Sequence, residues 1–208
     1  EAIGTAGVIQ QALKLHLPIK IVYLTNGDNN QLAFIVYKKH PVLSRKGMLK
    51  MGETRRKEAV AAMASLGVKR EDLIFLGYPD FGTMNILTEY WGKTRPFKSM
   101  LTRVKAVPYQ ECLSPKALYV GENVLKDLKF VLESFKPTKI FVTNAVDTNE
   151  DHRAANLFLQ IALWDSGGKI PKYEIYPYLI HVLGWPSPRG FHPELRLDPP
   201  KKLSAANI

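Results

Sequence analysis

Polar and ionisable side chains crowd one short segment of the chain. The segment is Thr143-Asn-Ala-Val-Asp147-Thr-Asn149-Glu-Asp151-His152-Arg153-Ala154. It follows an apolar run that predicts a buried strand over 139–143, and it opens a predicted helix over 151–165. Open α/β folds bind ligands at the carboxyl ends of their strands, so His152 can direct one imidazole nitrogen into that crevice. A nearby carboxylate can hold the proton on the other nitrogen, which prepares the imidazole for metal binding or proton transfer.

The same segment has a second interpretation that involves no chemistry. Asn149 is a good N-cap for the helix that follows, and Glu150 and Asp151 in its first turn are favoured by the helix dipole. Acidic first turns are common, so the residues alone leave both interpretations open.

Three further positions carry residue types suited to binding or catalysis. Arg55 lies at the expected start of a helix over 53–66, where a cation opposes the helix dipole and indicates recognition of an anion or a hydroxyl. The alternative is an exposed Arg55–Glu58 pair at spacing three. Asp80 follows a predicted strand over 73–77 and delivers a carboxylate to the same crevice, or forms an ordinary turn. His181 lies in an apolar segment, where a histidine is more often a core residue.

The elements that must position these residues alternate between strands and helices. Apolar runs predict buried strands at 19–25, 73–77, 139–143 and 173–183, and helical spacing of apolar residues predicts helices before Pro18 and over 53–66, 121–135 and 151–165. We expect a long basic loop over 29–52 and an irregular excursion over the substrate side across 81–118. This order predicts one three-layer, Rossmann-like α/β domain over 1–208 with a mainly parallel sheet. Such a domain normally opens with a central strand, which we expect before Glu1.

Composition excludes several classes of protein. The 208 residues include 29 Lys and Arg against 19 Asp and Glu, for a net charge of +10, and the basic residues are scattered. A diffuse excess without a recognition motif does not indicate specific nucleic-acid binding. No apolar run is long enough to span a membrane, and the single cysteine, Cys112, excludes an internal disulfide and four-cysteine zinc sites. The cytoplasm is the expected compartment.

Taken in order, these segments resemble the LmbE-like (PIG-L) family of zinc-dependent N-acetylglucosamine de-N-acetylases. The family opens with His-Pro-Asp-Asp-Glu, and Glu1-Ala-Ile-Gly4 looks like the last residue of that motif and the helix behind it. The other resembling segments are Val22-Tyr-Leu-Thr25-Asn-Gly27-Asp28, Glu53-Thr-Arg55-Arg56-Lys-Glu58, Leu76-Gly-Tyr-Pro-Asp80, Asp147-Thr-Asn149-Glu-Asp151-His152-Arg153 and Tyr178-Leu-Ile-His181.

The resemblance implies zinc-dependent hydrolysis of an N-acetyl amide on an amino-sugar conjugate. It assigns His152 as a zinc ligand, Arg55 and Asp80 as contacts to sugar hydroxyls, and Asp151 as the residue that orients a neighbouring donor. Asn149 stands where the family usually has a histidine, and an amide can donate a hydrogen bond to an oxyanion but cannot transfer a proton at neutral pH. His181 would then be the substitute proton donor. The family's other zinc ligands and its general base precede Glu1 and are not in this sequence.

Two other classes of protein stay open at this stage. One is a sugar- or nucleotide-binding α/β protein without catalysis, which the absent ligands and Asn149 favour. The other is a basic interaction module, which only the net charge supports.

Overall fold

The structure is a computed structural model that describes residues 2–29, 35–36, 44–196, 198, 200 and 203. Its elements are α1 (Ala2–Lys14), β1 (Ile21–Thr25), α3 (Arg45–Ser65), the short 3-10 helix η1 (Arg70–Asp72), β2 (Leu73–Tyr78), α4 (Thr83–Thr88), α5 (Gly121–Phe135), β3 (Lys139–Thr143), α6 (Glu150–Asp165) and β4 (Glu174–Tyr178). Glu1, for which a role in the family motif is expected, lies outside the described residues. So do residues 30–34 and 37–43 of the loop expected over 29–52.

The strands pair in parallel, as the alternation of strands and helices predicts. β1 pairs with β2 from Ile21–Leu73 onwards, and β3 pairs with β4 from Lys139–Glu174 onwards. The predicted α/β, Rossmann-like class is therefore confirmed. Within the described residues the two pairs are separate two-stranded sheets rather than one continuous sheet. The expectation of a further strand before α1 stays a prediction.

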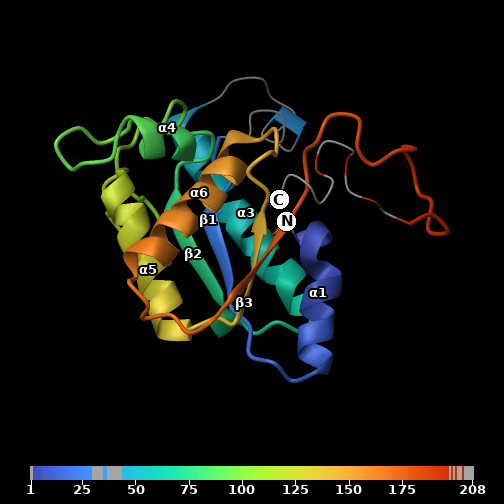
Figure 1. The fold of residues 1–208 in the computed structure, drawn as a ribbon. Helices are drawn as coiled ribbons and strands as arrows, with labels where there is room; N and C mark the ends of the chain where they lie inside the picture. The colour runs from blue at the N-terminus through green and yellow to red at the C-terminus, as the bar shows by residue number, and fades with distance from the viewer. Residues whose placement is uncertain are drawn as a thin grey trace.

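Helices flank these strands and bury their apolar side chains. Figure 1 shows α1 and α5 on opposite sides of the strands, with β1 and β2 between them. The main core joins Leu76 of β2 to Met63 of α3, Val124 of α5 and Phe158 of α6, all of which are buried. Burying each such side chain stabilises the fold by about 1.5–3 kcal/mol. The packing fixes the carboxyl ends of the strands, where the polar segments lie.

Helix α3 begins eight residues earlier than the sequence predicts. Ser44 is its N-cap and accepts a hydrogen bond from Gly47 N, so residues 45–52 are helical rather than part of a loop. Gly52 lies within this helix, and a Cβ at this position would lie 2.2 Å from the Tyr109 hydroxyl. Consequently Arg55 lies in the middle of α3, and the argument that placed it at a helix N-terminus is wrong.

The segment 81–118 is not simply a loop over the substrate side. It contains the short helix α4 and an isolated antiparallel bridge between Ala106 and Leu118. Val107, Tyr109 and Cys112 from this segment are buried in the main core. Part of the segment 81–118 therefore packs in the main core together with residues of the strands.

Strand β4 is shorter than the predicted strand over 173–183. It ends at Tyr178, and the backbone N–H groups of Ile180 and His181 donate instead to the Asp147 carboxylate, at 3.3 and 3.0 Å. The Asp147 carboxylate thus accepts these hydrogen bonds in place of a neighbouring strand, and the regular pairing of β4 with β3 ends before this point.

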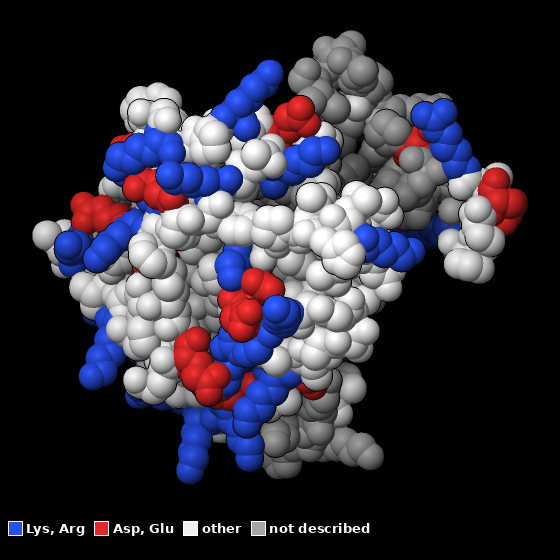
Figure 2. Space-filling view, turned by 90° about the horizontal axis from the view of Figure 1, so that it is seen from below, with Lys and Arg blue, Asp and Glu red and all other residues white. Residues whose placement is uncertain are grey.

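The surface carries a scattered positive charge. Figure 2 shows Lys and Arg side chains spread over one face of the molecule, with Asp and Glu side chains among them. In the described part of the chain, no helix has the length and apolar character needed to cross a membrane.

Candidate active site

An aspartate and a histidine meet where β3 ends and α6 begins. Nδ1 of His152 lies 3.1 Å from an oxygen of Asp147, whose side chain is fully buried while that of His152 is 14% exposed. The backbone of His152 is fixed as well, because its carbonyl accepts a hydrogen bond from the Thr143 hydroxyl at 2.8 Å. The expectation that a nearby carboxylate faces one imidazole nitrogen is confirmed, and Asp147 is that residue.

Several backbone donors keep Asp147 ionised. Burial would raise the pKa of Asp147, but hydrogen bonds from the backbone of His181 and Asn149 and from His152 hold this pKa below its usual value. A charged carboxylate favours a proton on Nδ1 of His152 and leaves the lone pair of Nε2 for a metal ion or a proton.

Asn149 caps helix α6, as one of the two open interpretations predicts. Its side-chain oxygen accepts hydrogen bonds from Asp151 N at 2.9 Å and His152 N at 3.3 Å. This contact orients the first turn that carries His152 and commits only the amide oxygen. The amide nitrogen is the atom that would donate to an oxyanion, so the catalytic assignment of Asn149 stays a prediction.

The Asp151 carboxylate ties α6 to the segment after β2. It accepts hydrogen bonds from Phe81 N, from Thr83 N at 3.1 Å and from the Thr83 hydroxyl. Asp151 thus has three hydrogen-bond donors that it could orient, two from the backbone and one from a side chain at the start of α4. Its catalytic assignment is otherwise untested.

Asp80 lies among other carboxylates at the carboxyl ends of β1 and β2. Its oxygens accept hydrogen bonds from Thr25 Oγ1 at 3.5 Å and Asn29 N at 3.3 Å, and its own N–H donates to Asp28. Burial, together with the negative charges of Asp151 and Asp28, raises the pKa of Asp80 to about 7. Near neutral pH this acid is therefore protonated in a large part of the molecules.

Asp28 is a buried member of the same group that the sequence reasoning did not single out. Burial raises the pKa of its carboxyl despite a hydrogen bond from the Tyr109 hydroxyl, which is 2.7 Å away. These partners are 81 positions apart in the sequence, so no local signal predicts their contact.

Arg55 and Arg56 have different environments on α3. Arg56 is buried and forms ion pairs with Glu53 and Glu111, which is a structural role. Arg55 is half exposed, its guanidinium lies 3.8 Å from Glu58, and its Nε would be 3.6 Å from a Cβ at Gly27. The exposed pair with Glu58 is thus confirmed, while Arg55 also reaches the turn that follows β1.

His181 joins the site from the end of β4. Its imidazole stacks on that of His152, with ring centroids 5.2 Å apart and an angle of 19° between the planes. Thr148 holds His181 in place through its N–H and its hydroxyl, which donate to the His181 carbonyl at 2.8 and 2.9 Å. His181 is exposed rather than a core histidine, so the proton-donor hypothesis keeps a geometric basis.

The residues that the structure describes do not make a complete metal site. Among residues 2–29 and 44–196, no three His, Cys, Asp or Glu side chains are grouped so that they could hold one metal ion. His152 offers Nε2, whereas the carboxylates of Asp147 and Asp151 are taken up by other donors. The described residues therefore do not by themselves fit the zinc that the family resemblance implies.

Together, these features define an α/β protein with a polar site at the carboxyl ends of parallel strands and an aspartate-held imidazole at its centre. When the chain is compared with models of known families, residues 1–163 match PIG-L, described as GlcNAc-PI de-N-acetylase. The chain belongs to this family, whose members are deacetylases or related hydrolases. The comparison with curated proteins gives no significant match.

Proposed function

We propose that this protein hydrolyses the N-acetyl amide of an amino-sugar conjugate. The observation that carries the proposal is the His152 imidazole, held by the Asp147 carboxylate at 3.1 Å at the strand end where such folds bind ligands. Family membership supports the reaction type, because the family is described as a GlcNAc-PI de-N-acetylase.

The reaction needs water to attack the amide carbonyl carbon and a proton to reach the departing nitrogen. Water adds to the carbonyl carbon and gives a tetrahedral oxyanion. The carbon–nitrogen bond then breaks as the nitrogen takes up a proton, and the products are acetate and the free amine of the sugar. In the proposal, Nε2 of His152 either accepts a proton from water or binds the zinc ion. One lone pair cannot do both, so the zinc content of the protein decides between these two roles.

Zinc dependence belongs to the proposal and needs further ligands. A bound zinc ion would lower the pKa of its water and polarise the carbonyl. Of the residues described by the structure, His152 is the one proposed to bind it, and the other ligands would come from outside the described ranges.

Other side chains are proposed to bind the substrate and stabilise charge. Asn149 Nδ2 would donate to the developing oxyanion, and His181 would give a proton to the leaving amine. Arg55 and Asp80 would contact sugar hydroxyls, since charged hydrogen-bonding groups position hydroxyls firmly.

The test measures release of the free amine from an N-acetylglucosaminyl-inositol conjugate, together with zinc per chain after dialysis. We expect His152→Ala to lower kcat by at least 100-fold and to reduce bound zinc. The matched control is His16→Asn, since His16 lies at the end of α1 with a φ of 53°, a conformation that Asn tolerates. Undiminished turnover by His152→Ala would refute the proposal. Turnover that is lost while the zinc content is unchanged would assign His152 to proton transfer.

A further inference from the structure

The aromatic residue Phe81 follows the carboxyl end of β2, directly after Asp80. The residue is 55% exposed, and among the described residues it is not one of those that pack in the main core. Its backbone N–H donates a hydrogen bond to the Asp151 carboxylate at the start of α6. Phe81 is therefore the sequence neighbour of Asp80 and is hydrogen-bonded to the residue that precedes His152.

The backbone of Phe81 has a conformation that its side chain disfavours. Its φ is 54°, and it is the apolar one among the five non-glycine residues with a positive φ in the described part of the chain. A bulky side chain is strained in this left-handed region, which glycine adopts freely. The surroundings impose the turn, because Asp151 accepts from the N–H groups of Phe81 and Thr83. A Cβ at the intervening Gly82 would lie 2.6 Å from the Phe97 ring. A glycine at position 81 would fit this turn without strain, so the fold does not explain the aromatic ring there.

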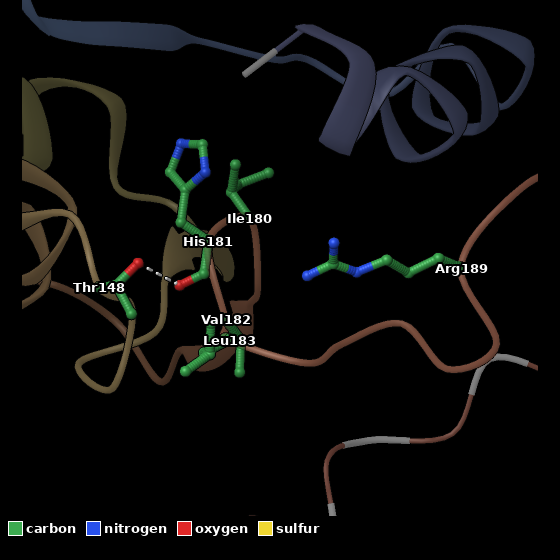
Figure 3. Close-up of a pocket in the computed structure, with 6 residues that line it drawn as sticks. All are labelled: Thr148, Ile180, His181, Val182, Leu183 and Arg189. Atoms are coloured by element: carbon green, nitrogen blue, oxygen red, sulfur yellow. Dashed lines mark hydrogen bonds between the residues drawn. The ribbon is translucent and has the colours of Figure 1, made fainter.

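An exposed aromatic ring next to a carboxyl group suits the binding of a sugar. A pyranose has two faces made of C–H groups and a rim of hydroxyls, so it needs a flat apolar surface with hydrogen-bonding groups beside it. Figure 3 shows the groove beside His181, which is lined by Thr148, Ile180, His181, Val182, Leu183 and Arg189. These described lining residues include no phenyl, phenol or indole ring. Phe81 therefore offers a kind of contact that this groove lacks.

We propose that the Phe81 ring is a stacking platform that packs against a C–H face of the amino sugar, while Asp80 contacts the hydroxyls of the same sugar. The identity of the ligand rests on the proposed function. The strained turn is then kept because it presents an aromatic ring at the strand end, and backbone strain that the surroundings impose is typical of binding sites. Phe81 sets the affinity for the sugar and takes no part in the chemical step.

The experiment titrates methyl glucosaminide into the full chain and follows the protons of the ligand by NMR. This sugar already carries the free amine, so the proposed reaction does not consume it. An aromatic ring stacked on the sugar shifts its C–H protons upfield in the bound state, which a purely structural role of Phe81 would not produce. Phe81→Tyr keeps the ring and should keep both the shift and the affinity. Phe81→Leu keeps an apolar side chain without the ring, so it should lose the shift and weaken binding about 10-fold.

Phe81→Gly separates sugar binding from folding. It removes the ring and relieves the strained φ, so the affinity for the sugar should fall about 10-fold while the melting temperature rises by about 2–4 °C. The matched control is Phe130→Leu, since Phe130 is 60% exposed on α5, and this variant should keep native affinity. Native affinity in both Phe81→Leu and Phe81→Gly would overturn the proposal, as would binding to the wild type without an upfield shift of the sugar protons.

Amine release from the N-acetylated conjugate keeps this inference separate from the proposed function. In the proposal, Phe81→Leu raises KM about 10-fold and leaves kcat close to native, which is the pattern of lost ground-state binding. If the sugar binds with a shift that depends on Phe81 but the wild type releases no amine, the stacking platform stands and the hydrolase proposal fails. If the wild type releases amine and KM is native in Phe81→Leu, the hydrolase proposal stands and the stacking platform fails.

Discussion

Replacing Asp147 with Asn tests whether the carboxylate prepares His152 for chemistry. The substitution keeps the size of the side chain and removes its charge. One oxygen of Asp147 faces His152 Nδ1 at 3.1 Å and also accepts from the N–H groups of His181 and Ile180. The other oxygen accepts from Asn149 N at 2.8 Å. An amide offers one oxygen and one NH2 group, so at least one of these buried donors must face another donor.

The structural cost follows from this conflict. A buried donor left without a partner costs about 1–3 kcal/mol, which lowers the melting temperature of a chain of this size by roughly 2–12 °C. The chemical cost is separate, because a neutral amide no longer favours the proton on Nδ1. In another aspartate–histidine pair this change lowers kcat by about 10⁴-fold, and we expect at least about 10²-fold here.

Two measurements separate these costs in one set of variants. Nitrogen chemical shifts of the His152 imidazole report which nitrogen carries the proton, and amine release gives kcat. The control is Asp165→Asn, since Asp165 is at the surface and pairs with Lys129 at 2.6 Å. We expect Asp147→Asn to change the His152 tautomer and kcat together. Native kcat with an unchanged tautomer would show that Asp147 only anchors the backbone of Ile180 and His181, which follow β4.

Three further predictions concern the surrounding residues. The folded-state pKa of Asp80 is raised to about 7, so between about pH 4 and 7 the folded protein binds more protons than the unfolded chain. Its stability therefore falls as the pH rises through that window. Asp80→Asn should flatten this dependence of stability on pH, as measured by thermal unfolding. Arg55→Lys should lower kcat/KM by about 10-fold with little change in melting temperature, and a lowered melting temperature with native kinetics would leave only the pair with Glu58. Asn149→Asp keeps a good helix cap but places a negative charge near the oxyanion. It should therefore lower kcat by about 10²-fold or more while stability stays native. A native kcat in this variant would reject the catalytic role of Asn149.

The features that were predicted correctly from the sequence are those formed by residues close together in the chain. Asp147, Asn149 and His152 lie within six residues, so a strand that ends and a helix that begins there place them together. The cap and the carboxylate beside the imidazole followed from that local order. Strand β3 and helix α5 were likewise predicted with their observed bounds, 139–143 and 121–135, because their apolar spacing is regular.

Distant contacts explain what the sequence could not predict. Gly52 weakens a helix by propensity, yet the Tyr109 hydroxyl requires the space that a Cβ would fill, and α3 continues through it. Strand β4 stops at Tyr178, and Asp147 accepts hydrogen bonds from the N–H groups of Ile180 and His181 beyond it. Arg189 lies in a proline-rich stretch without periodicity, and only the folded chain brings it opposite His181.

The surroundings shift the pKa values of two acids at the site in opposite directions, lowering that of Asp147 and raising that of Asp80. Asp147 is buried but accepts four hydrogen-bonding or charged donors, so it stays ionised and serves the imidazole. Asp80 is partly buried, and both desolvation and the negative charges of Asp151 and Asp28 favour its neutral form. A protonated carboxyl can donate to a sugar hydroxyl as well as accept from one. A pH change through the raised pKa of Asp80 would therefore alter the sugar recognition proposed for Asp80, while the lowered pKa of Asp147 keeps that carboxylate charged. Such a separation of acids by environment is how one site keeps binding and proton transfer distinct.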